Sequence, residues 1–572
     1  MVRRLNDIAI VICGAAGQGI ATVEDLLTGI LKQAGYHCYS TSEFMSRIRG
    51  GTNSTLIRVS SNRINPTFVD RIDILIPLHF SALPHLKHRI TSKTIILGEE
   101  KNIDEQYCDN REQIIKVPFS EIAKEVGGVI YTNIVAVGVF LAFFEVKEEI
   151  SQTYLIEMFT LKGSKIVEQN IQACKRGYSI GNELVNSRKF RNTLQKDNSV
   201  LNDIILSGAE AIGMGAIAGG CNFISSYPMS PSTSVLVFLS HYAKNFDIVV
   251  DQAEDEIAAI NKGIAAWYAG GRAMITTSGG GFALMTEGVS LSGMLEIPMV
   301  LHIGQRPGPA TGLPTRTGQE DLQHVLNAGH GEFARVILAP GTPEDAFYLT
   351  QKAFNLADKY QIPVFILTDQ FFLDSHYSIP DLDLSSIKND KYIVKTNRDY
   401  KRYRLTDDGI SPRGIPGYGD GLVNVDSDEH DEDGHITEDV HETRPKMVEK
   451  RLYKKLNLLR KEILEPELIG NKDYKILVIG WGSTYGVIKE AIENLGKDDI
   501  AFLHFSQVYP LNSNISEFLE KAEKTVILEN NATSQFGKVL KLELDLDINE
   551  KFLKYNGMPF SAEEVIAYLD KI

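Results

Sequence analysis

Short apolar runs recur along the chain, and a segment with helical periodicity follows most of them. Runs of this kind are typical of strands that are buried on both faces of a parallel sheet. We expect strands at 8–13, 72–77, 94–98, 113–117, 364–368, 475–479, 501–505 and 525–529. Helices are expected at 20–35, 132–144, 161–176, 207–219, 235–242 and 346–360. The alternation of strand and helix predicts an α/β fold built on parallel sheets.

Two changes in composition divide the chain into domains. Residues 187–201 hold many Lys, Arg, Asn and Ser side chains and few apolar ones, which is typical of a linker. Residues 375–445 combine proline and glycine with many acidic side chains and predict a long loop or inter-domain arm. The sequence therefore predicts three consecutive α/β domains, at 1–190, 202–380 and 470–572, with an arm and a charged helix at 381–465.

The charge balance argues against nucleic acid as a partner. The chain has 59 Lys and Arg against 74 Asp and Glu, a net charge of −15, so its long-range field repels nucleic acid and anionic membranes. No apolar run approaches the roughly 20 residues of a membrane helix, and the N-terminus lacks an apolar signal core. We expect a soluble cytoplasmic protein.

The cysteines and histidines do not predict a metal centre. The five cysteines show no CxxC spacing, so we expect neither a zinc site nor an iron–sulfur cluster, but thiols kept reduced in the cytoplasm. His430, His435 and His441 lie among carboxylates in the predicted arm and could bind a divalent cation. A solvated or interface loop is the preferred interpretation, because ligand spacing in a flexible acidic run is poor evidence.

A glycine turn follows the first apolar run and opens the first helix. This order suits phosphate or adenylate binding at a helix N-terminus, although the spacing of Gly14, Gly17 and Gly19 is not GxGxxG. A tight turn without a ligand is the alternative. Arg47 and Arg49 stand just before two glycines and could bind an anion, or lie in an exposed turn.

Three unusual segments, 226–233, 251–256 and 305–315, each come where a strand-like run ends. In an open parallel sheet the carboxyl ends of the strands line one crevice, so the three segments can meet around one ligand. Arg306 could hold a carboxylate bidentately, or be a surface or ion-paired arginine. The hydroxyls of Ser230, Ser232 and Thr233 could line the cleft, or cap a helix.

Glu254 and Glu256 stand where a helix begins. Acids there are usually explained by the helix dipole. A buried carboxyl at this place could instead exchange a proton with a heteroaromatic nitrogen. The sequence leaves both interpretations open.

The cleft motifs, in this order, resemble the α subunit of the 2-oxoacid:ferredoxin oxidoreductases. The turn Gly17-Gln18-Gly19-Ile20 and the segment Arg47-Ile48-Arg49-Gly50-Gly51 resemble that family's γ subunit, fused ahead of α as in the 2-oxoglutarate-type enzymes. The resemblance covers essentially the whole chain. It rests on Tyr227-Pro228-Met229-Ser230-Pro231-Ser232-Thr233, Gln252-Ala253-Glu254, the Thr-Thr-Ser-Gly-Gly-Gly-Phe run at 276–282, residues 305–315 and Gly329-His330-Gly331-Glu332.

The resemblance implies oxidative decarboxylation of a 2-oxoacid to an acyl-CoA and CO2 on thiamine diphosphate, with electrons passing to ferredoxin. The domains would be a γ-type Rossmann-like domain, a pyrimidine-binding domain and a transketolase C-terminal-like domain. Glu254, with Glu256 as the fallback, would hydrogen-bond the pyrimidine nitrogen. The other implied contacts are Gly279 and Gly280 to the cofactor, Arg306, Tyr227, Ser230 and Thr311 to the substrate, and Gly17, Gln18, Gly19, Arg47 and Arg49 to coenzyme A.

The resemblance also implies a partner chain. The one Gly-Asp-Gly run, 419–421, lies in the predicted arm, without asparagines at the spacing of a diphosphate and magnesium motif. A β subunit that carries thiamine diphosphate, Mg²⁺ and a [4Fe–4S] cluster is therefore expected, in an (αβ)2 assembly. Serine stands at position 230, where the family has threonine, so the resemblance does not fix the substrate. We prefer 2-oxoglutarate, with pyruvate, a branched-chain or an aryl 2-oxoacid as alternatives. A non-catalytic structural paralogue is the alternative to an enzyme.

Overall fold

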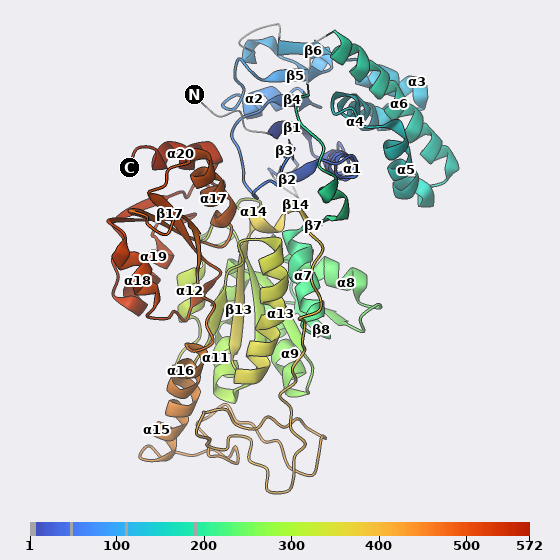
Figure 1. The fold of residues 1–572 in the computed structure, drawn as a ribbon. Coiled ribbons are helices and arrows are strands. Elements are labelled where there is room, and N and C mark those ends of the chain that lie inside the picture. The colour runs from blue at the N-terminus through green and yellow to red at the C-terminus, as the bar shows by residue number, and fades with distance from the viewer. Residues whose placement is uncertain (1–6, 46–49, 109–112, 188–191) are drawn as a thin grey trace. The chain divides into compact units, whose positions relative to one another are not determined.

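The computed structural model describes residues 7–45, 50–108, 113–187 and 192–572. The chain forms two compact units, with elements labelled in Figure 1. The first comprises Met1–Leu206, Ser375–Asp381 and Ser561–Ala567, and the second comprises Ser207–Asp374, Leu382–Phe560 and Tyr568–Ile572. Strands and helices alternate in both, which confirms the predicted α/β class.

The first unit contains a mixed sheet of eight strands in the order β6-β5-β4-β1-β3-β2-β14-β7. Strand β1 is central, pairing parallel with β4 and antiparallel with β3. The strands are β1 (Asp7–Ala15), β2 (His37–Glu43), β3 (Thr52–Ser60), β4 (Ile74–Pro77), β5 (Ile95–Gly98), β6 (Ile114–Lys116), β7 (Ile204–Ser207) and β14 (Ser375–Ile379). The helices are α1 (Ile20–Gln33), α2 (Ala82–Leu86), α3 (Phe119–Val126), α4 (Thr132–Phe143), α5 (Glu148–Phe159) and α6 (Ser164–Asn186).

Helix α4 forms the centre of the helical layer in the first unit, because it is apolar on every side and ten of its twelve residues are buried. It packs against α6 at two glycines. A Cβ atom at Gly138 would collide with Cys174 O, and one at Gly177 with Val135 O. Both positions therefore need a residue without a side chain to let the two helix backbones approach.

Strand β14 was not among the strands expected from the sequence. Residues 375–379 fall at the start of the predicted arm, yet they pair antiparallel with β2. Ser375, Tyr377 and Ile379 are buried and alternate with half-buried residues, the pattern of a strand with one buried face. This strand belongs to the same sheet as β1, so the sheet draws on residues that the sequence division placed in the segment 202–380.

The second unit is built around a seven-stranded sheet in the order β18-β12-β13-β11-β10-β8-β9. All neighbours pair parallel except the edge strand β18. The strands are β8 (Phe223–Ser226), β9 (Val249–Gln252), β10 (Ala273–Ser278), β11 (Met299–Gln305), β12 (Val336–Leu338), β13 (Pro363–Asp369) and β18 (Gln507–Tyr509). Its helices are α7 (Gly208–Ala218), α8 (Thr233–Tyr242), α9 (Glu256–Tyr268), α10 (Gly279–Phe282), α11 (Thr286–Leu295), α12 (Leu322–Asn327), α13 (Pro343–Tyr360) and α14 (Gln370–Leu373).

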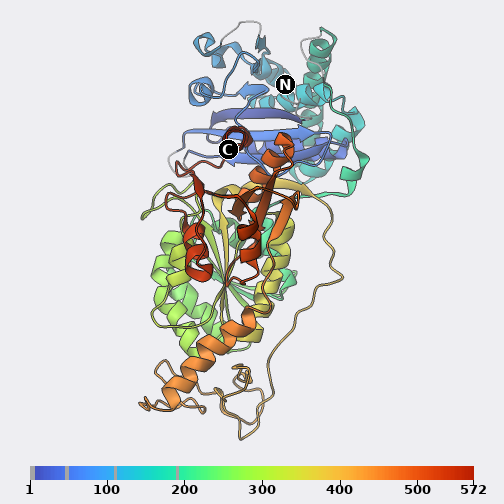
Figure 2. The same ribbon diagram turned by 60° about the vertical axis from the view of Figure 1, so that its left-hand side comes forward.

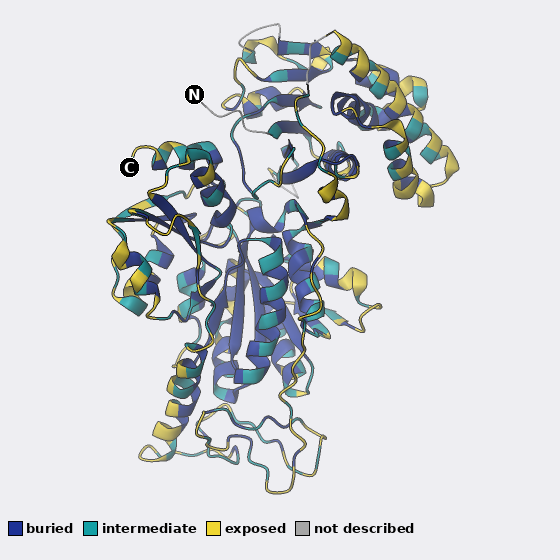
Figure 3. Ribbon diagram, in the orientation of Figure 1, coloured by how far each residue is buried: buried dark blue, intermediate teal, exposed yellow. Residues whose placement is uncertain are grey.

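The middle of this sheet is the core of the second unit. Every residue of β10, β11 and β13 is buried, as the dark blue strands in Figure 3 show. Helices α7 and α13 pack on each other against one face of the sheet (Figure 1). Such burial on both faces is what the continuous apolar runs of these strands require.

The second unit also contains a five-stranded sheet, in the order β15-β17-β16-β19-β20. Its strands are β15 (Glu467–Gly470), β16 (Ile476–Trp481), β17 (Ile500–Phe505), β19 (Lys524–Glu529) and β20 (Glu550–Leu553). The helices here are α17 (Thr484–Leu495), α18 (Ile515–Lys521) and α19 (Gln535–Leu544), and the chain closes with α20 (Ala562–Leu569). Gln319 joins the two sheets of this unit, because its Nε2 donates to Trp481 O at 2.8 Å and its Oε1 accepts from Asn530 N at 2.9 Å.

Over residues 382–442, most of the segment predicted as an arm, the described chain forms neither helix nor strand. Figure 2 shows this segment passing alongside the seven-stranded sheet of the second unit to a group of loops beside the helix that follows. That helix consists of α15 (Thr443–Val448), a π-helical stretch (Glu449–Lys454) and α16 (Lys455–Leu459). The arm is ordered without regular structure because buried polar contacts hold it.

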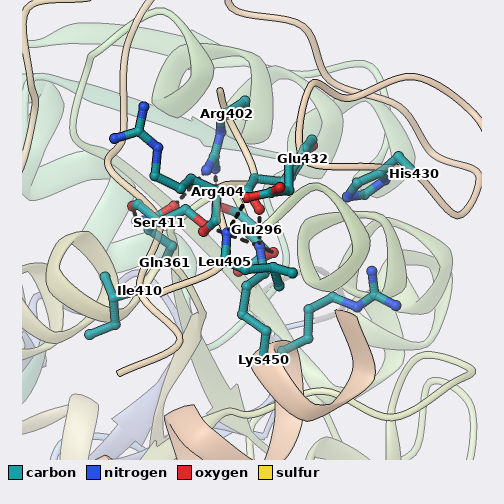
Figure 4. A network of polar contacts seen from close by, with 12 residues as sticks. Glu296, Gln361, Arg402, Arg404, Leu405, Ile410, Ser411, His430, Glu432 and Lys450 are labelled. Atoms are coloured by element: carbon teal, nitrogen blue, oxygen red, sulfur yellow. Dashed lines mark hydrogen bonds and ion pairs between the residues drawn. The ribbon is translucent and has the colours of Figure 1, made fainter. Parts of the chain in front are cut away.

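Those contacts form a cluster, the cation clamp, made of Glu296, Arg402, Lys450 and Lys455. Figure 4 shows Glu296, Arg402 and Lys450 of this cluster. The Glu296 carboxylate pairs with Lys450 Nζ and Lys455 Nζ, each at 2.6 Å, while Arg402 Nη2 donates to the Glu296 carbonyl at 2.6 Å. All four residues are at most 2% exposed. Glu296 follows the last residue of α11, so the clamp lies at the amino end of β11, the opposite end of that strand from Arg306.

The C-terminal ends of two helices help to balance the charge of the clamp, in which three cations face one carboxylate. Arg402 donates a hydrogen bond to Leu295 O at the end of α11. Lys455 Nζ donates to Gln361 O, just after α13, at 3.2 Å. The negative end of a helix dipole favours cations. Burial alone would raise the pKa of Glu296, but the two lysines and Arg402 outweigh it and hold that pKa well below its ordinary value.

Candidate active site

Loops at the carboxyl ends of four neighbouring strands, β11, β10, β8 and β9, form the candidate site. Arg306 follows β11, the glycine helix α10 follows β10, the loop 227–232 follows β8 and Glu256 follows β9. These are the strand ends at which ligands bind in open α/β sheets. The three segments singled out from the sequence thus lie at one edge of one sheet.

Arg306 and Ser230 are brought together. Arg306 Nη1 donates to the carbonyl oxygen of Ser230 at 2.6 Å, the only hydrogen bond of this guanidinium within the described residues. The loop that carries Ser230 is packed onto β11, because a Cβ atom at Gly304 would lie 3.1 Å from Pro231 Cγ. Burial lowers the pKa of Arg306, while nearby Asp321 opposes that shift. The guanidinium keeps donors that a ligand carboxylate can accept.

Tyr227 and Thr311 lie at the exposed margin of the same region. Tyr227 is 40% exposed, and Thr311 is exposed in the loop between Arg306 and α12. That loop is closed on itself, since Leu313 N donates to Pro307 O at 3.0 Å. Both side chains are accessible to a ligand or to a second chain.

Glu254 and Glu256 differ sharply in exposure and in their hydrogen-bond partners. The Glu254 side chain is 69% exposed and pairs with Lys262 at 3.1 Å. Hydrogen bonds from its own backbone N–H and from Lys262 hold its pKa below the ordinary value, so it stays ionised in solvent. Glu256 is 3% exposed, and its Oε1 has no hydrogen-bond partner. Glu256, the stated fallback, therefore fits the role of proton carrier better.

Four buried polar atoms around α10 lack a partner among the described residues: Glu256 Oε1, Ser278 Oγ, Asp321 Oδ2 and His324 Nε2. Buried polar atoms in native proteins are nearly always hydrogen-bonded, so unsatisfied ones call for an explanation. Glu256 Oε1 lies beside Gly281, Asp321 lies against Gly279, and the His324 ring meets Phe282 edge to face. Their grouping marks this turn as a place prepared for a polar ligand.

The glycines of α10 have different surroundings. Both oxygens of the Asp321 carboxylate would collide with a Cβ atom at Gly279, and Thr277 Oγ1 would collide with one at Gly281. Gly280 is exposed, and a Cβ atom there would approach only Ala310 O, at 3.5 Å. The absence of side chains at Gly279 and Gly281 thus lets Asp321 and Thr277 approach the turn. At Gly280 it leaves open space on the outer side of the turn.

The glycine turn of the first unit opens onto a cavity of about 800 Å³. Gly17 and Gly19 line it in left-handed conformations that favour glycine, with φ of 85° and 72°. Gln18 folds back on the turn, since its Oε1 accepts from Ala15 N at 2.7 Å. Lys101, Lys124 and Lys162 also line the cavity, together with Glu99, which pairs with Lys101 at 2.9 Å, so Lys124 and Lys162 supply its excess positive charge. Arg47 and Arg49 lie outside the described residues.

The arm histidines do not assemble a metal site. No group of three or more His, Cys, Asp or Glu side chains suited to a metal occurs in the parts of the chain that the structure describes. His430 is buried, and its ring stacks at 3.8 Å on Tyr403, next to the clamp. Within the same residues, no helix combines the length and apolarity needed to cross a membrane.

Comparisons with known proteins identify the family that the chain resembles. Residues 214–450 match the family model described as pyruvate flavodoxin/ferredoxin oxidoreductase, thiamine diP-bdg, and residues 9–180 match pyruvate ferredoxin/flavodoxin oxidoreductase. The 2-oxoacid:ferredoxin oxidoreductase subunit alpha of a Sulfolobus species is 33% identical, with 98% of this chain and 96% of that protein covered. The 2-oxoglutarate oxidoreductase subunit KorA of Mycobacterium tuberculosis is 29% identical, with 76% and 67% covered.

A solved structure is similar along the whole chain. It is the 2-oxoglutarate:ferredoxin oxidoreductase from Magnetococcus marinus with 2-oxoglutarate, coenzyme A and succinyl-CoA bound. The TM-score is 0.92 at 28% sequence identity, and the match covers 99% of this chain and 100% of the other. The likeness therefore includes both units and the arm.

Proposed function

Because the chain belongs to the 2-oxoacid:ferredoxin oxidoreductase family, as an α subunit with a γ-type region at its N-terminus, we propose that 2-oxoglutarate is its substrate. The reaction is oxidative decarboxylation to an acyl-CoA, with electrons passed to ferredoxin. The observation that carries the choice of substrate is the full-length similarity to a structure that holds 2-oxoglutarate and succinyl-CoA. Arg306 beside the loop of Ser230 supports it, because a 2-oxoacid brings a carboxylate.

Thiamine diphosphate, when bound, supplies the nucleophilic ring carbon and the electron sink that decarboxylation needs. Glu256 fits this cofactor, because its Oε1 is buried and unpaired at the strand ends. We assign it to hold a proton at Oε1 and exchange it with a ring nitrogen. Gly279 and Gly280 would lie against the cofactor. Gly280 has open space on its outer side.

Arg306 is assigned to hold the carboxylate of the 2-oxoacid next to the reacting carbon. Its Nη1 is anchored on Ser230 O, so the guanidinium fork is fixed before substrate arrives. Ser230, Tyr227 and Thr311 are assigned to the walls of the same pocket. Their hydroxyls can bind the oxo group or the far end of the substrate.

Replacing the arginine tests this assignment. Arg306→Ala is expected to raise the KM for 2-oxoglutarate about 10- to 100-fold, since a hydrogen bond to a charged group is worth about 1.5–3 kcal/mol. Arg306→Lys keeps the charge but not the planar fork, so its KM should fall between the two. Steady-state kinetics of the complex with the partner subunit measure both. An unchanged KM in Arg306→Ala would remove this residue from the site.

The cavity of the first unit is assigned to coenzyme A. Gly17, Gln18 and Gly19 place the N-terminus of α1 at the cavity, and backbone N–H groups there attract phosphate. Lys162 and Lys124 add positive charge. The contribution of Arg47 and Arg49 stays a prediction from the sequence.

Reversing one charge in this cavity should affect coenzyme A alone. Lys162→Glu is expected to raise the KM for coenzyme A about tenfold, the equivalent of roughly 1.4 kcal/mol, and to leave the KM for 2-oxoglutarate unchanged. Lys165→Glu is the matched control, because this lysine is three residues away, exposed, and not part of the cavity. Equal effects of both variants would point to overall charge and not to a coenzyme A site.

The partner is proposed to be a β subunit that carries Mg²⁺, a [4Fe–4S] cluster and the other half of the thiamine diphosphate site, in an (αβ)2 assembly. A cytoplasmic location stays a prediction from the sequence. The direct test is to purify the chain with its co-expressed partner and to measure CoA-dependent viologen reduction with a panel of 2-oxoacids. A preference for pyruvate, branched-chain or aryl acids would overturn the choice of substrate. Bound cofactor without turnover of any 2-oxoacid would favour the structural paralogue.

A further inference from the structure

A second acid, Asp321, lies in the cleft beside Arg306 and has no assigned role. Its Oδ2 is buried without a hydrogen-bond partner, and both carboxylate oxygens occupy the space that a Cβ atom on Gly279 would fill. Its backbone N donates to Gln305 Oε1 at 3.0 Å. Gln305 is the residue next to Arg306, so the acid and the guanidinium are positioned by the same end of β11.

The usual explanation for an aspartate at this place does not hold. Asp321 stands at the N-cap of α12, where an aspartate normally accepts a hydrogen bond from a backbone N–H of the first turn. Here the side chain makes no capping hydrogen bond. The carboxyl instead points toward α10, away from the helix it precedes. Its burial is therefore not explained by helix stability.

The segment before Asp321 is held rigidly. Gln319 N donates to Asn530 O at 2.7 Å, and Gln319 Oε1 accepts from Asn530 N at 2.9 Å. Gln535 Nε2 donates to Glu320 O at 2.7 Å. These contacts hold the backbone on both sides of Glu320, so the main chain that carries Asp321 is fixed.

Four ionisable groups surround Asp321. Glu320 precedes it, Arg306 follows β11, His324 lies on the first turn of α12, and Glu256 reaches the other side of α10. Burial raises the pKa of Asp321 to about 7, with Glu320 adding to the rise and Arg306 opposing it. Burial lowers the pKa of His324, so that ring is neutral near pH 7. Asp321 therefore changes charge near neutral pH.

We propose that Asp321 is a positioning residue that sets how tightly Arg306 holds the carboxylate of the 2-oxoacid. In its neutral form it leaves the full charge of Arg306 to the substrate. In its ionised form it attracts the guanidinium itself and repels the incoming carboxylate, because like charges in a partly buried site interact strongly. The inference rests on the proposed role of Arg306.

The direction of the pH effect follows. Below about pH 7 Asp321 is neutral and substrate affinity is high. As the pH rises through that value the acid ionises and affinity falls. Substrate binding and proton binding are thus linked, and each favours the other. A coupling that moves the pKa by about one unit corresponds to about a tenfold loss of affinity at alkaline pH.

The test is the inhibition constant of glutarate, a dicarboxylate without the reactive oxo group, measured from pH 6 to 8.5 on the complex with the partner subunit. For the wild type we expect this Ki to rise about tenfold across the range. Asp321→Asn keeps the shape of the side chain without its charge, and its Ki should stay flat and low.

A second variant separates titration from a merely structural role. Since Glu320 raises the pKa of Asp321, Glu320→Gln should shift the rise in Ki to lower pH without removing it. If Asp321→Asn retains the wild-type pH dependence of Ki, Asp321 does not control binding and the inference is wrong. If instead the wild-type complex turns over no 2-oxoacid, the proposed function is wrong. The activity assay shows this independently of the Ki measurements.

Discussion

Glu256→Gln is expected to lower kcat by about 10²- to 10⁴-fold, the range that general acid–base groups contribute. The amide has the same shape, so it can still fill the space beside Gly281, but it cannot exchange a proton with a ring nitrogen. The KM for the 2-oxoacid should change little, because Arg306 and not Glu256 is assigned to hold the substrate. Steady-state kinetics of the complex, together with the bound thiamine diphosphate content, measure this.

Glu254→Gln is the matched control, since it makes the same chemical change two residues earlier. Its carboxylate lies in solvent and pairs with Lys262, and exposed pairs of this kind contribute little because solvent screens them. We expect kcat within about twofold of the wild type. A large loss in Glu254→Gln with normal turnover in Glu256→Gln would reverse the assignment and restore the glutamate first preferred from the motif.

The choice between these glutamates could have been made from the sequence by following the helix. Asp255 is the N-cap, and its side chain accepts from Ala258 N at 2.8 Å, so Glu256 is the first helical residue. From there the spacing of four, three and four residues leads to Ile260, Gly263 and Trp267, which are all buried. A carboxyl at the first position of a buried, apolar helix face points toward the protein interior. Glu254 precedes the helix, and the match to the Gln-Ala-Glu motif alone did not show this.

Strand β14 shows what local pattern could not predict. Its sequence, Ser-His-Tyr-Ser-Ile, has two clearly apolar residues in five and begins a segment rich in proline, glycine and acids. What makes it a strand is pairing with β2, more than 300 residues away in sequence. The antiparallel strands β2 and β3 were also not predicted, because many of their residues are polar. These residues are buried through partners in other elements: Glu24, on α1, accepts a hydrogen bond from Ser40 Oγ at 2.6 Å.

Asp321 was hidden from sequence analysis in another way. An aspartate before a short helix predicts a capping hydrogen bond to the first turn. The sequence gives no sign that this hydrogen bond is absent here. Its environment depends on Gln319 meeting Trp481 and Asn530, residues of a sheet that begins about 150 positions later. Strand ends and glycine turns could therefore locate the cleft, whereas the state of an acid inside it required the tertiary contacts.

The cation clamp was not expected from the sequence either, and it gives the largest predicted effect on stability. Glu296→Gln is expected to destabilise the arm by about 3–5 kcal/mol, the cost of breaking a buried ion pair by removing one partner. Lys450, Lys455 and Arg402 would remain buried with only carbonyl groups and the Ser411 hydroxyl to face. Limited proteolysis with mapped cleavage sites should show new cuts within 382–442, and thermal unfolding should begin at a lower temperature.

Two further variants identify the cause. Glu442→Gln removes the carboxylate of an exposed pair with Lys446 on α15, and it should change stability by less than about 0.5 kcal/mol. The triple variant Glu296→Leu, Lys450→Met and Lys455→Met replaces the buried pairs by apolar side chains, and it should recover most of the loss, because the cost comes from uncompensated charge and not from lost attraction. Should Glu296→Gln resist proteolysis as well as the wild type does, the arm is held by its other contacts, such as Arg413 on Asp358, and the clamp is not its main anchor.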